Sequence, residues 1–552
     1  MTGRFDHEVI IAGAGPAGLT LANLLGLYGI DTLVLEQNAS TVHEPRAVSI
    51  DDESLRTLQL IGLIGPAIAR MAPGYGSIYL DPKRRPFAAV HPVAEEFGWP
   101  KRNAFRQPVL EAQLAEGARA RPGVALRFET TILEHHDDGE CVSVTTEHGG
   151  ERRVLRARYL IGCDGGRSRT RRAIGATLGG SSFEEKWLIL DTSSTTDPNR
   201  HTHVFSDPYR PALSLPGPDR TRRYEIRLRP GEDPAEMETE ARARELIAWY
   251  GGDPAVTIDR RVVYTFQARI ADHWRRGRVF LCGDAAHLTP PFAGQGMNAG
   301  IRDVSNLAWK LAAVLRGQLG EGLLDSYQTE RRDHAWSMIQ LAVNLGVLIS
   351  PHGTLRSALI RLAVRAMGLV PAWKDWLVQM RYKPRPRFDA GFVLRDAAIG
   401  AELPGRMFPQ PRVETVPGTV LRLDELLGTG FSALVCAADP PALWARVAPH
   451  LPALFTASIV AILPDRIAFS ASAFPPGVAA TFARDLTGSL FRALAPKNAA
   501  AGPLPEAVVL LRPDRYVAAV ITADGAPAQG RQLARMLEES FAGQAEPLHR
   551  AA

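Results

Sequence analysis

The segment from Arg278 to Leu311, RVFLCGDAAHLTPPFAGQGMNAGIRDVSNLAWKL, constrains the fold of this chain more than any other stretch. An apolar run ends at Gly283-Asp284, and a loop rich in proline and glycine leads from there into a helical pattern. A short apolar run that ends in glycine is typical of a buried parallel strand. The segment therefore predicts a strand, a tight turn that carries a carboxylate, and a helix, in an α/β fold.

A second glycine turn lies near the start of the chain. The sequence GAGPAG follows the apolar run Val9 to Ala12 and precedes a leucine-rich helical stretch, which is the context that a dinucleotide-binding βαβ unit requires. The first glycine permits the turn, the second lets the backbone approach a pyrophosphate, and the third lets the helix pack on the strand. Glu36 ends the next strand, where a carboxylate accepts hydrogen bonds from a ribose. The predicted dinucleotide contacts are Gly13, Gly15, Pro16, Ala17, Gly18 and Glu36, and this stretch alone does not say which dinucleotide binds.

Composition narrows the class of protein. The 552 residues carry a formal net charge of +5, spread without a long basic block, which disfavours nucleic acid and suits attraction of an anionic substrate or cofactor. The four cysteines are isolated, so zinc ribbons and dithiol chemistry are not expected and no metal site is predicted. Reduced cysteines, the absence of a signal peptide and the absence of an apolar stretch of membrane length together predict a cytoplasmic protein without a membrane span.

The pattern along the chain predicts several layers. Residues from about Val124 to Asp164 alternate like antiparallel strands, and residues from Lys186 to Gln267 again read mostly as strands with one helical insertion. A helical region follows, and a proline-bearing linker leads to a small α/β domain. The predicted division begins with the first part of a dinucleotide-binding domain at 1–182, with segments that contribute to the substrate layer. A substrate-binding sheet follows at 183–272, then the second part of the dinucleotide-binding domain with a helical region at 273–395, and a C-terminal domain at 404–552.

One helical stripe within that region has two interpretations. Leu355, Leu359, Leu362 and Ala366 recur at helical spacing, with arginines off the stripe. A membrane-surface helix shows such a pattern, but a helix packed against its own protein is the interpretation favoured here.

Three separated motifs resemble one family. They are GAGPAG at Gly13 to Gly18, CDGGRSRTRR at Cys163 to Arg172, and GDAAHLTPPFAGQGMN at Gly283 to Asn298. In order and spacing the chain resembles the single-component flavoprotein aromatic hydroxylases, which have the p-hydroxybenzoate hydroxylase fold. Four further stretches resemble the 3-(3-hydroxyphenyl)propionate hydroxylase-like branch, and they span Pro45 to Leu63, Phe105 to Leu114, Asp207 to Glu232, and Leu510 to Val520.

The resemblance implies FAD as the cofactor and assigns residues to it. Asp284 would bond the ribityl chain, and backbone N–H groups at a helix start would face the flavin N1–C2=O edge, where the helix dipole favours the charge of reduced flavin. Arg46 and Gln107 match positions that contact FAD, and Asp164 matches a motif linked to both FAD and the nicotinamide cofactor. Beyond the first motif, the implied FAD contacts are Arg46, Gln107, Asp164, Gly283, Asp284, Pro291, Gly294, Gly296, Met297 and Asn298.

The family chemistry implies the reaction. Reduced FAD would react with O2 to a C4a-hydroperoxide whose distal oxygen attacks an electron-rich ring, with NADH or NADPH as reductant. The implied substrate is a small phenol similar to 3-hydroxyphenylpropionate. The alternatives left open are a hydroxylase of a larger phenol, such as a polyketide or flavonoid, and a flavin reductase or dehydrogenase that transfers no oxygen.

Residues for substrate and catalysis are less defined. We expect the substrate between the middle sheet and the flavin loop, and strand alternation points half of such side chains away. The residues expected at the reacting ring are Arg223, Tyr224 and Pro291, and the further expected substrate contacts are His203, Tyr209, Arg210 and Phe292. No general base is identified.

The C-terminal domain resembles the thioredoxin-like extension of this branch but lacks a cysteine pair. A structural or oligomer-contact role, as in a homodimer, is therefore expected there.

Overall fold

The computed structural model describes residues 5–350, 353–396, 399–416, 418–465, 467, 474–495 and 504–540. The chain divides into two compact units. The first comprises Met1–Glu95, Pro100–Val304 and Ala335–Pro384, and the second comprises Glu96–Trp99, Ser305–His334 and Arg385–Ala552. Residues 541–552 of the expected C-terminal domain lie outside the described part of the chain.

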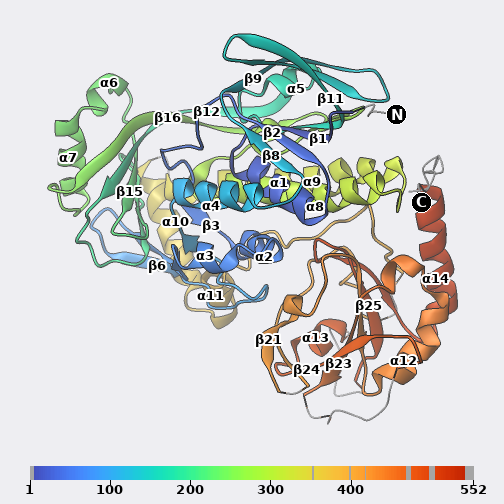
Figure 1. Cartoon of the computed structure of the whole chain (residues 1–552). Helices are drawn as coiled ribbons and strands as arrows, with labels where there is room; N and C mark the ends of the chain where they lie inside the picture. The colour runs from blue at the N-terminus through green and yellow to red at the C-terminus, as the bar shows by residue number, and fades with distance from the viewer. Residues whose placement is uncertain are drawn as a thin grey trace. The chain divides into compact units, whose positions relative to one another are not determined.

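The first sheet of unit 1 begins with the βαβ unit expected from the sequence (Figure 1). Strand β1 (His7–Ala12) is followed by helix α1 (Pro16–Leu27) and by β2 (Thr32–Leu35), which pairs parallel to β1. The helix forms around apolar residues, since Leu19, Leu21 and Leu25 are fully buried. The remaining strands of this sheet are β8 (Val124–Arg127), β9 (Thr130–Asp137), β10 (Val142–His148), β11 (Glu151–Gly162), β17 (Arg275–Arg276) and β18 (Val279–Leu281).

The pairing of these strands corrects one expectation. Strands β9, β10 and β11 are antiparallel neighbours, as predicted. Strand β8, however, pairs parallel to β2, and the end of β11 pairs parallel to β1. Helix α4 (Gln107–Arg119) precedes β8 and packs beside α1, and a strand that returns through such a helical crossover is parallel to its neighbour.

The second sheet of unit 1 has eight strands in the order β19-β16-β12-β15-β14-β13-β5-β6. Their bounds are β5 (Ser77–Leu80), β6 (Pro86–Val90), β12 (Leu178–Ser193), β13 (Thr202–Phe205), β14 (Ala212–Pro216), β15 (Arg222–Arg227), β16 (Thr257–Ala271) and β19 (His287–Leu288). Helices α6 (Pro234–Met237) and α7 (Glu240–Trp249) form the expected insertion between β15 and β16. Because β19 follows the second glycine turn and pairs with β16, this turn lies at the edge of the second sheet.

Smaller elements complete unit 1. A three-stranded sheet has the order β3-β7-β4. Its strands are β3 (Ser49–Ile50), β4 (Ala72–Pro73) and β7 (Asn103–Ala104), and the remaining helices that begin or lie in this unit are α2 (Asp52–Leu60), α3 (Ile64–Ile68), α5 (Arg169–Ala173), α8 (Gly296–Leu315), α9 (Ser326–Ile349), α10 (Thr354–Met367) and α11 (Pro371–Val378). Helices α8 and α9 each continue across the boundary between the two units.

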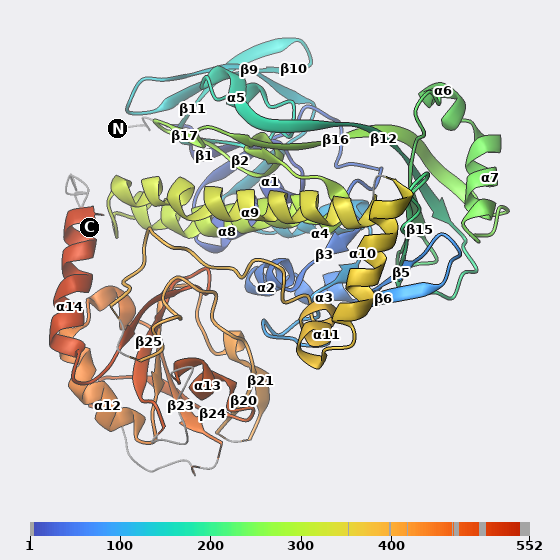
Figure 2. The ribbon, with the colours of Figure 1, turned by 180° about the vertical axis from the view of Figure 1, so that it is seen from behind.

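The leucine stripe of α10 is not packed as expected. Leu355, Leu359 and Leu362 are 73%, 57% and 65% exposed. The helix packs against its own protein as expected, since it contacts β6, but the leucine stripe is not the face that packs. Figure 2 shows α10 and α11 beside β6, which α10 contacts. Ser357 is buried on this helix while the leucines face outward.

No single helix among the described residues has the length and apolar character needed to cross a membrane. One bent pair, Glu321–Ile349 with Thr354–Met367, passes the same test of length and composition.

Unit 2 contains a seven-stranded sheet in the order β21-β20-β24-β23-β22-β25-β26. Its strands are β20 (Arg412–Thr415), β21 (Val420–Arg422), β22 (Ser432–Cys436), β23 (Ile459–Pro464), β24 (Ala480–Asp485), β25 (Ala507–Leu511) and β26 (Val517–Ile521), with helices α12 (Pro440–Val447), α13 (Ser489–Leu494) and α14 (Ala526–Arg535). The central strands β22, β23 and β24 are parallel. Cys436 is buried in β22 and is a free thiol.

Candidate active site

The first glycine turn leaves one position open. A Cβ on Gly18 would lie 2.0 Å from the carbonyl oxygen of Gly13, and a Cβ on Gly13 would lie 2.5 Å from that of Cys163, whereas one on Gly15 would meet no atom within 4 Å. Gly13 also has φ +102°, a conformation that glycine adopts at little cost. Gly18 and Gly13 therefore serve close packing, and Gly15 leaves room for a ligand at the start of α1, where Pro16 and Ala17 form the first turn.

Glu36 lies beside this turn. Its Oε2 accepts a hydrogen bond of 2.9 Å from the backbone N–H of Ala14, and its Oε1 accepts one from Asn38. The carboxylate at the end of β2 is thus held next to the glycine motif, which is the place expected for a ribose contact.

The second glycine turn lies against the first. A short 3-10 helix covers Gly283–Ala285 after β18, and a Cβ on Gly283 would come within 3.3 Å of the Ala17 Cβ. Gly300, one turn into α8, would place a Cβ 3.4 Å from the same atom. Two motifs that are far apart in the sequence are therefore in direct contact.

Asp284 occupies a recessed position in this turn. Its side chain is exposed to solvent, yet surrounding protein desolvates the carboxyl enough to raise its pKa above the ordinary value. A carboxylate that solvent reaches while protein surrounds it lines a recess. Such a recess next to the open Gly15 fits an extended cofactor with hydroxyl groups, as FAD is.

A buried pair, His287 and Asp303, stabilises the second glycine turn. His287 Nε2 lies 2.7 Å from Asp303 Oδ2, and the same carboxylate oxygen accepts the backbone N–H of Gly283 at 3.1 Å. Asp303 is fully buried on α8. Reasoning from the sequence did not identify Asp303, because nothing in its surroundings in the chain marks it as a partner of the turn.

The loop between this turn and α8 is fixed through Asn298. Gly294 is left-handed, with φ +61°, and its carbonyl accepts Asn298 Nδ2 at 2.7 Å. The Asn298 Oδ1 accepts the N–H of Asp51 and the hydroxyl of Ser54. The side chain of Asn298 is therefore fully hydrogen-bonded within the protein. An anionic flavin edge would instead meet the backbone N–H groups in the first turn of α8, at Gly296, Met297 and Asn298.

Gln107 organises the loop that carries Arg46. Its Oε1 accepts the N–H groups of Arg46 and Ala47 at 3.0 and 2.7 Å, and its Nε2 donates to Glu111 at 2.7 Å. Burial raises the pKa of Glu111 even though its hydrogen bond with Gln107 opposes that shift. The sequence did not single out Glu111, which lies one helical turn from Gln107.

Asp164 accepts hydrogen bonds from the first turn of helix α5, whose N-cap is Ser168. Its Oδ2 accepts the backbone N–H and the hydroxyl of Thr170, both at 3.0 Å, and its Oδ1 accepts Ser168 Oγ at 2.5 Å. Because a Cβ on Gly13 would also lie 3.2 Å from the Asp164 Cα, this third motif adjoins the first. Both carboxylate oxygens of Asp164 thus accept hydrogen bonds within this turn.

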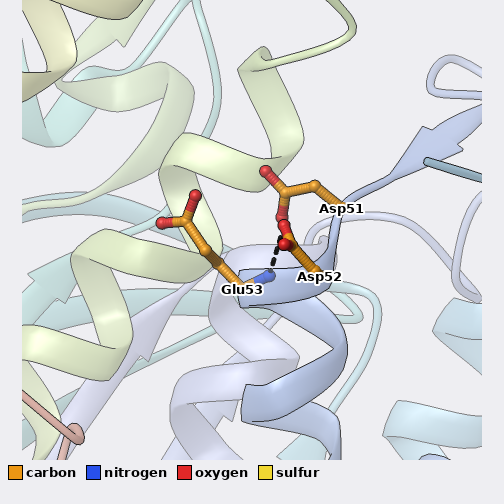
Figure 3. A group of neighbouring side chains, drawn as sticks. All are labelled: Asp51, Asp52 and Glu53. Atoms are coloured by element: carbon orange, nitrogen blue, oxygen red, sulfur yellow. Dashed lines mark hydrogen bonds between the residues drawn. The ribbon is translucent and has the colours of Figure 1, made fainter. Parts of the chain in front are cut away.

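An acidic triplet lies behind the flavin loop. Figure 3 shows Asp51, Asp52 and Glu53 close together at the start of α2, with carboxylate oxygens within 4.8 Å of one another, a spacing that could hold a metal. Two cations already pair with Asp51 and Glu53. Arg302 Nε donates to Glu53 at 2.7 Å and its guanidinium also bonds Asp51, and Lys383 Nζ lies 3.0 Å from Asp51 and 2.7 Å from Glu53. We therefore assign the triplet to a buried salt-bridge network that joins α2 to α8.

The second sheet separates the expected substrate residues between its two faces. On one face, here called the aromatic face, Phe292 packs with Trp187, Ile189, Leu213 and Phe266. The rings of Phe292 and Trp187 are 5.3 Å apart, and Pro291 precedes Phe292 in the same 3-10 turn. Because Phe292 belongs to the flavin loop, this is the face that the loop covers.

Tyr224 and His203 lie on the opposite face. Tyr224 packs with Leu246 and Ile247 of the α7 insertion. His203 lies on the same face as Tyr224, because Ser214 is the cross-strand partner of both residues. The structure thus does not bring these two residues to the flavin loop, because strand parity places neighbours on alternate faces.

The two remaining expected contacts lie apart from the aromatic cluster. Tyr209 is 67% exposed. Arg210 is buried and ion-paired with Glu232, and the hydroxyl of Tyr250 donates to its carbonyl.

Arg223 does reach the loop that carries Arg46. Its Nε donates to Asp191 Oδ1 at 2.7 Å, and its Nη1 donates to the carbonyl of Arg46 at 2.6 Å. Its Nη2 bonds Asp191 again and the carbonyl of Pro45. Arg223 therefore ties the second sheet to the cofactor loop.

Two glycine turns in contact beside the parallel strands β1 and β2, with the loop after the second turn covering the aromatic face of a second sheet, are features of a dinucleotide-binding fold. A family model described as "FAD binding domain" matches residues 6–342, and one described as "HcaD C-terminal domain" matches residues 405–536. The chain belongs to the class A FAD-binding monooxygenases and is a flavin-dependent aromatic hydroxylase.

Two relatives match this chain over nearly the whole length of both proteins. A 3-(3-hydroxy-phenyl)propionate/3-hydroxycinnamic acid hydroxylase of Mycobacterium sp. (strain JLS) is 39% identical over 527 residues, which are 95% of this chain and 90% of that protein. The enzyme of that name from Escherichia coli (strain K12 / DH10B) is 37% identical over 522 residues, covering 93% and 91%. In fold, the flavin-dependent monooxygenase PieE matches with a TM-score of 0.76 at 22% identity, covering 97% of this chain and 99% of that one.

Proposed function

We propose that this chain uses NAD(P)H and O2 to hydroxylate a small phenol that resembles 3-(3-hydroxyphenyl)propionate. The observation that carries the proposal is the identity of 37–39% with hydroxylases of that name, over at least nine-tenths of both chains. The balanced reaction takes the phenol, O2, NAD(P)H and one proton to the diphenol, water and NAD(P)+. When bound, reduced FAD supplies the activated oxygen that is transferred to the ring.

The residues of this chain would bind and orient the reactants. We assign the adenosine and pyrophosphate half of FAD to Gly13, Gly15 and Glu36, and the ribityl chain to Asp284. The start of α8 at Gly296 would face the flavin ring, with Arg46 and the Asp164 turn alongside. These roles are supported by the contact between the two glycine turns and by the recessed position of Asp284.

The aromatic face would hold the substrate ring. Phe292 and Pro291 extend the flavin loop over Trp187 and Phe266, so a flat apolar ring would be oriented and water excluded there. We place Arg223 as the link between this face and the cofactor loop, and we place Tyr224 and His203 outside the ring site.

We also propose a thioredoxin-like arrangement for residues 404–552. The parallel strands β22, β23 and β24, with β25 and β26 antiparallel beside them, support it. Its single buried thiol, Cys436, has no cysteine partner among the described residues, and burial raises its pKa far above the ordinary value, so a contact role between two copies of the chain is favoured over redox chemistry.

The reaction can be tested with purified holoenzyme. The protein should be yellow, phenols should accelerate its NAD(P)H oxidation, and mass spectrometry should show one 18O atom from labelled O2 in the product. A panel that runs from hydroxyphenylpropionates to polyketides and flavonoids identifies the substrate size. NAD(P)H oxidation without labelled product would instead indicate a reductase or dehydrogenase and would contradict the proposal.

A further inference from the structure

Glu225 lies in the middle of the aromatic face. It is on β15, two residues from Arg223, and its cross-strand partners are Ile189 on β12 and Leu213 on β14. Both partners belong to the cluster that packs with Phe292 of the flavin loop. Because paired residues of antiparallel strands point to the same side, Glu225 points to the side that the flavin loop covers.

The carboxylate of Glu225 has no hydrogen-bond partner among the described residues, although the residue is only 4% exposed. Its nearest cation is Arg223, at 4.0 Å. That guanidinium is already engaged by Asp191 and by the carbonyls of Pro45 and Arg46. Buried carboxylates are ordinarily hydrogen-bonded, so this one is a group that a ligand can satisfy.

The surroundings hold Glu225 near the point of ionisation. Burial raises its pKa to about 6, Arg223 acts against that shift and Asp191 adds to it. The other charged groups on this face come from three elements and the cofactor loop. They include Arg227 on the same strand, which pairs with Glu185 on β12, and Asp191, also on β12. Arg260 on β16 pairs with Asp191 and with Glu44 of the cofactor loop.

We propose that Glu225 accepts a hydrogen bond from the hydroxyl of the bound phenol and takes its proton while the ring is hydroxylated. This inference rests on the proposed function, and it supplies the base that the sequence did not identify. A hydroxyl that donates to a carboxylate pushes electron density to the ortho and para carbons, which an electrophilic oxygen attacks.

Glu225 holds the phenolic proton during the reaction and returns it afterwards. The phenolic O–H bond breaks as its proton moves to the Glu225 carboxylate. A C–O bond forms at the ring while the O–O bond that derives from O2 breaks, and the second oxygen leaves as water. The ring then loses the C–H proton of the attacked carbon to solvent, and Glu225 returns its proton to the original oxygen. The oxygen and the reductant are the O2 and NAD(P)H of the proposed reaction.

The first experiment measures binding to the oxidised holoenzyme, which needs no turnover. The probes are 3-(3-hydroxyphenyl)propionate and its methyl ether, titrated from pH 5 to 8 and followed by the flavin absorbance. In the wild type, phenol affinity should fall as the pH drops below about 6, because Glu225 is then protonated. We call this fall in affinity the acid limb of the titration. The methyl ether should show no acid limb. Glu225→Gln should lose the limb and bind the phenol about ten-fold or more weakly at pH 8.

The matched control is Glu238→Gln. Glu238 lies after α6, and its Oε1 accepts the N–H of Val263 at 2.6 Å, a bond that glutamine can keep. This variant should bind both probes as the wild type does. If Glu225→Gln retains the phenol affinity and the acid limb of the wild type, the inference is wrong.

Two outcomes separate this inference from the proposed function. A wild type that forms labelled product while Glu225→Gln keeps an unchanged acid limb overturns only the role of Glu225. A wild type that binds neither probe and forms no product overturns both. If Glu225→Gln does not load FAD, the wild type still decides, since equal pH dependence for phenol and ether would contradict the role of Glu225.

Discussion

At the scale of single residues, the glycines of the first turn have different roles. A Cβ on Gly18 would clash with the Gly13 carbonyl at 2.0 Å, whereas Gly15 has open space and an extended conformation, with φ −78°. We expect Gly18→Ala to lower the stability of the apoprotein by about 1–3 kcal/mol. Gly15→Ala should fold normally but lose FAD affinity, because its Cβ enters the space that a pyrophosphate needs.

Melting of the apoprotein and FAD titration by fluorescence quenching measure the two effects separately. Equal FAD affinity in Gly15→Ala and the wild type would argue against a dinucleotide at this turn. A Gly18→Ala variant as stable as the wild type would mean that the turn can relax.

Asp52 lowers the stability of the folded protein at neutral pH. Burial is the main cause that raises the pKa of Asp52 to about 7, with Asp51 and Glu53 adding to it against Lys383. The folded protein therefore holds a proton on Asp52 that the unfolded chain releases near pH 4. Stability should fall as the pH rises from about 4 to 7 on account of this residue.

Asp52→Asn tests this cost, because asparagine keeps the acceptor that Asp52 Oδ1 offers to the N–H of Glu53. Melting should show this variant more stable than the wild type by about 2–4 kcal/mol at pH 8 and little different at pH 4. Asp219→Asn, at an exposed position paired with Arg70, is the control and should follow the wild type at both pH values. If Asp52→Asn were less stable than the wild type at pH 8, Asp52 would be ionised at that pH and its charge would stabilise the fold.

At the scale of elements, the sequence predicted the strands and helices of the βαβ unit to within one or two residues, because apolar runs and glycine punctuation are local signals. It also placed the α7 insertion. It could not assign the face of each strand in the second sheet, since both faces of β15 are buried and the chain alternates without a polar side. Arg223 and Tyr224 are neighbours in the sequence, but only Arg223 reaches the cofactor loop.

The stripe on α10 gives a test at this scale. Leu359 is 57% exposed, whereas Leu25 on α1 is fully buried. Leu359→Ser should change the free energy of unfolding by less than about 0.5 kcal/mol, as surface substitutions do. Leu25→Ala should cost about 2–5 kcal/mol. Chemical denaturation compares the two, and a large loss in Leu359→Ser would show that the stripe is covered in solution.

At the scale of the whole molecule, unit 2 is assembled from distant stretches of the chain. Residues 305–334 supply Lys310 and Glu330, and the C-terminal region supplies Arg512 and Asp514. The first three are almost completely excluded from solvent, and Asp514 is 8% exposed. Arg512 bonds Glu330 at 2.8 and 2.7 Å, and Lys310 bonds the same carboxylate at 2.8 Å. No local pattern in the sequence indicates this, because the pairing joins residues nearly two hundred positions apart.

This network predicts that the C-terminal region is part of one folding unit with 305–334. Burial alone would raise the pKa of Glu330, but Arg512 and Lys310 outweigh it and lower that pKa to about 2. The resulting stabilisation is present above about pH 4.5 and is lost as the pH falls toward 2. Arg512→Met leaves a buried carboxylate with one cation and should cost about 3–5 kcal/mol at pH 7.

The matched control is Arg446→Met, whose partner Asp524 is exposed, and it should cost less than about 1 kcal/mol. Denaturation at pH 7 and pH 3 measures both variants, and the deficit of Arg512→Met should shrink at the lower pH because Glu330 then takes up a proton. A deficit that is small at pH 7 would mean that the network contributes little. A chain cut after residue 403 should then fold and bind FAD, whereas a large deficit predicts that such a chain cannot accumulate as a folded protein, since Glu330 would lose Arg512 altogether.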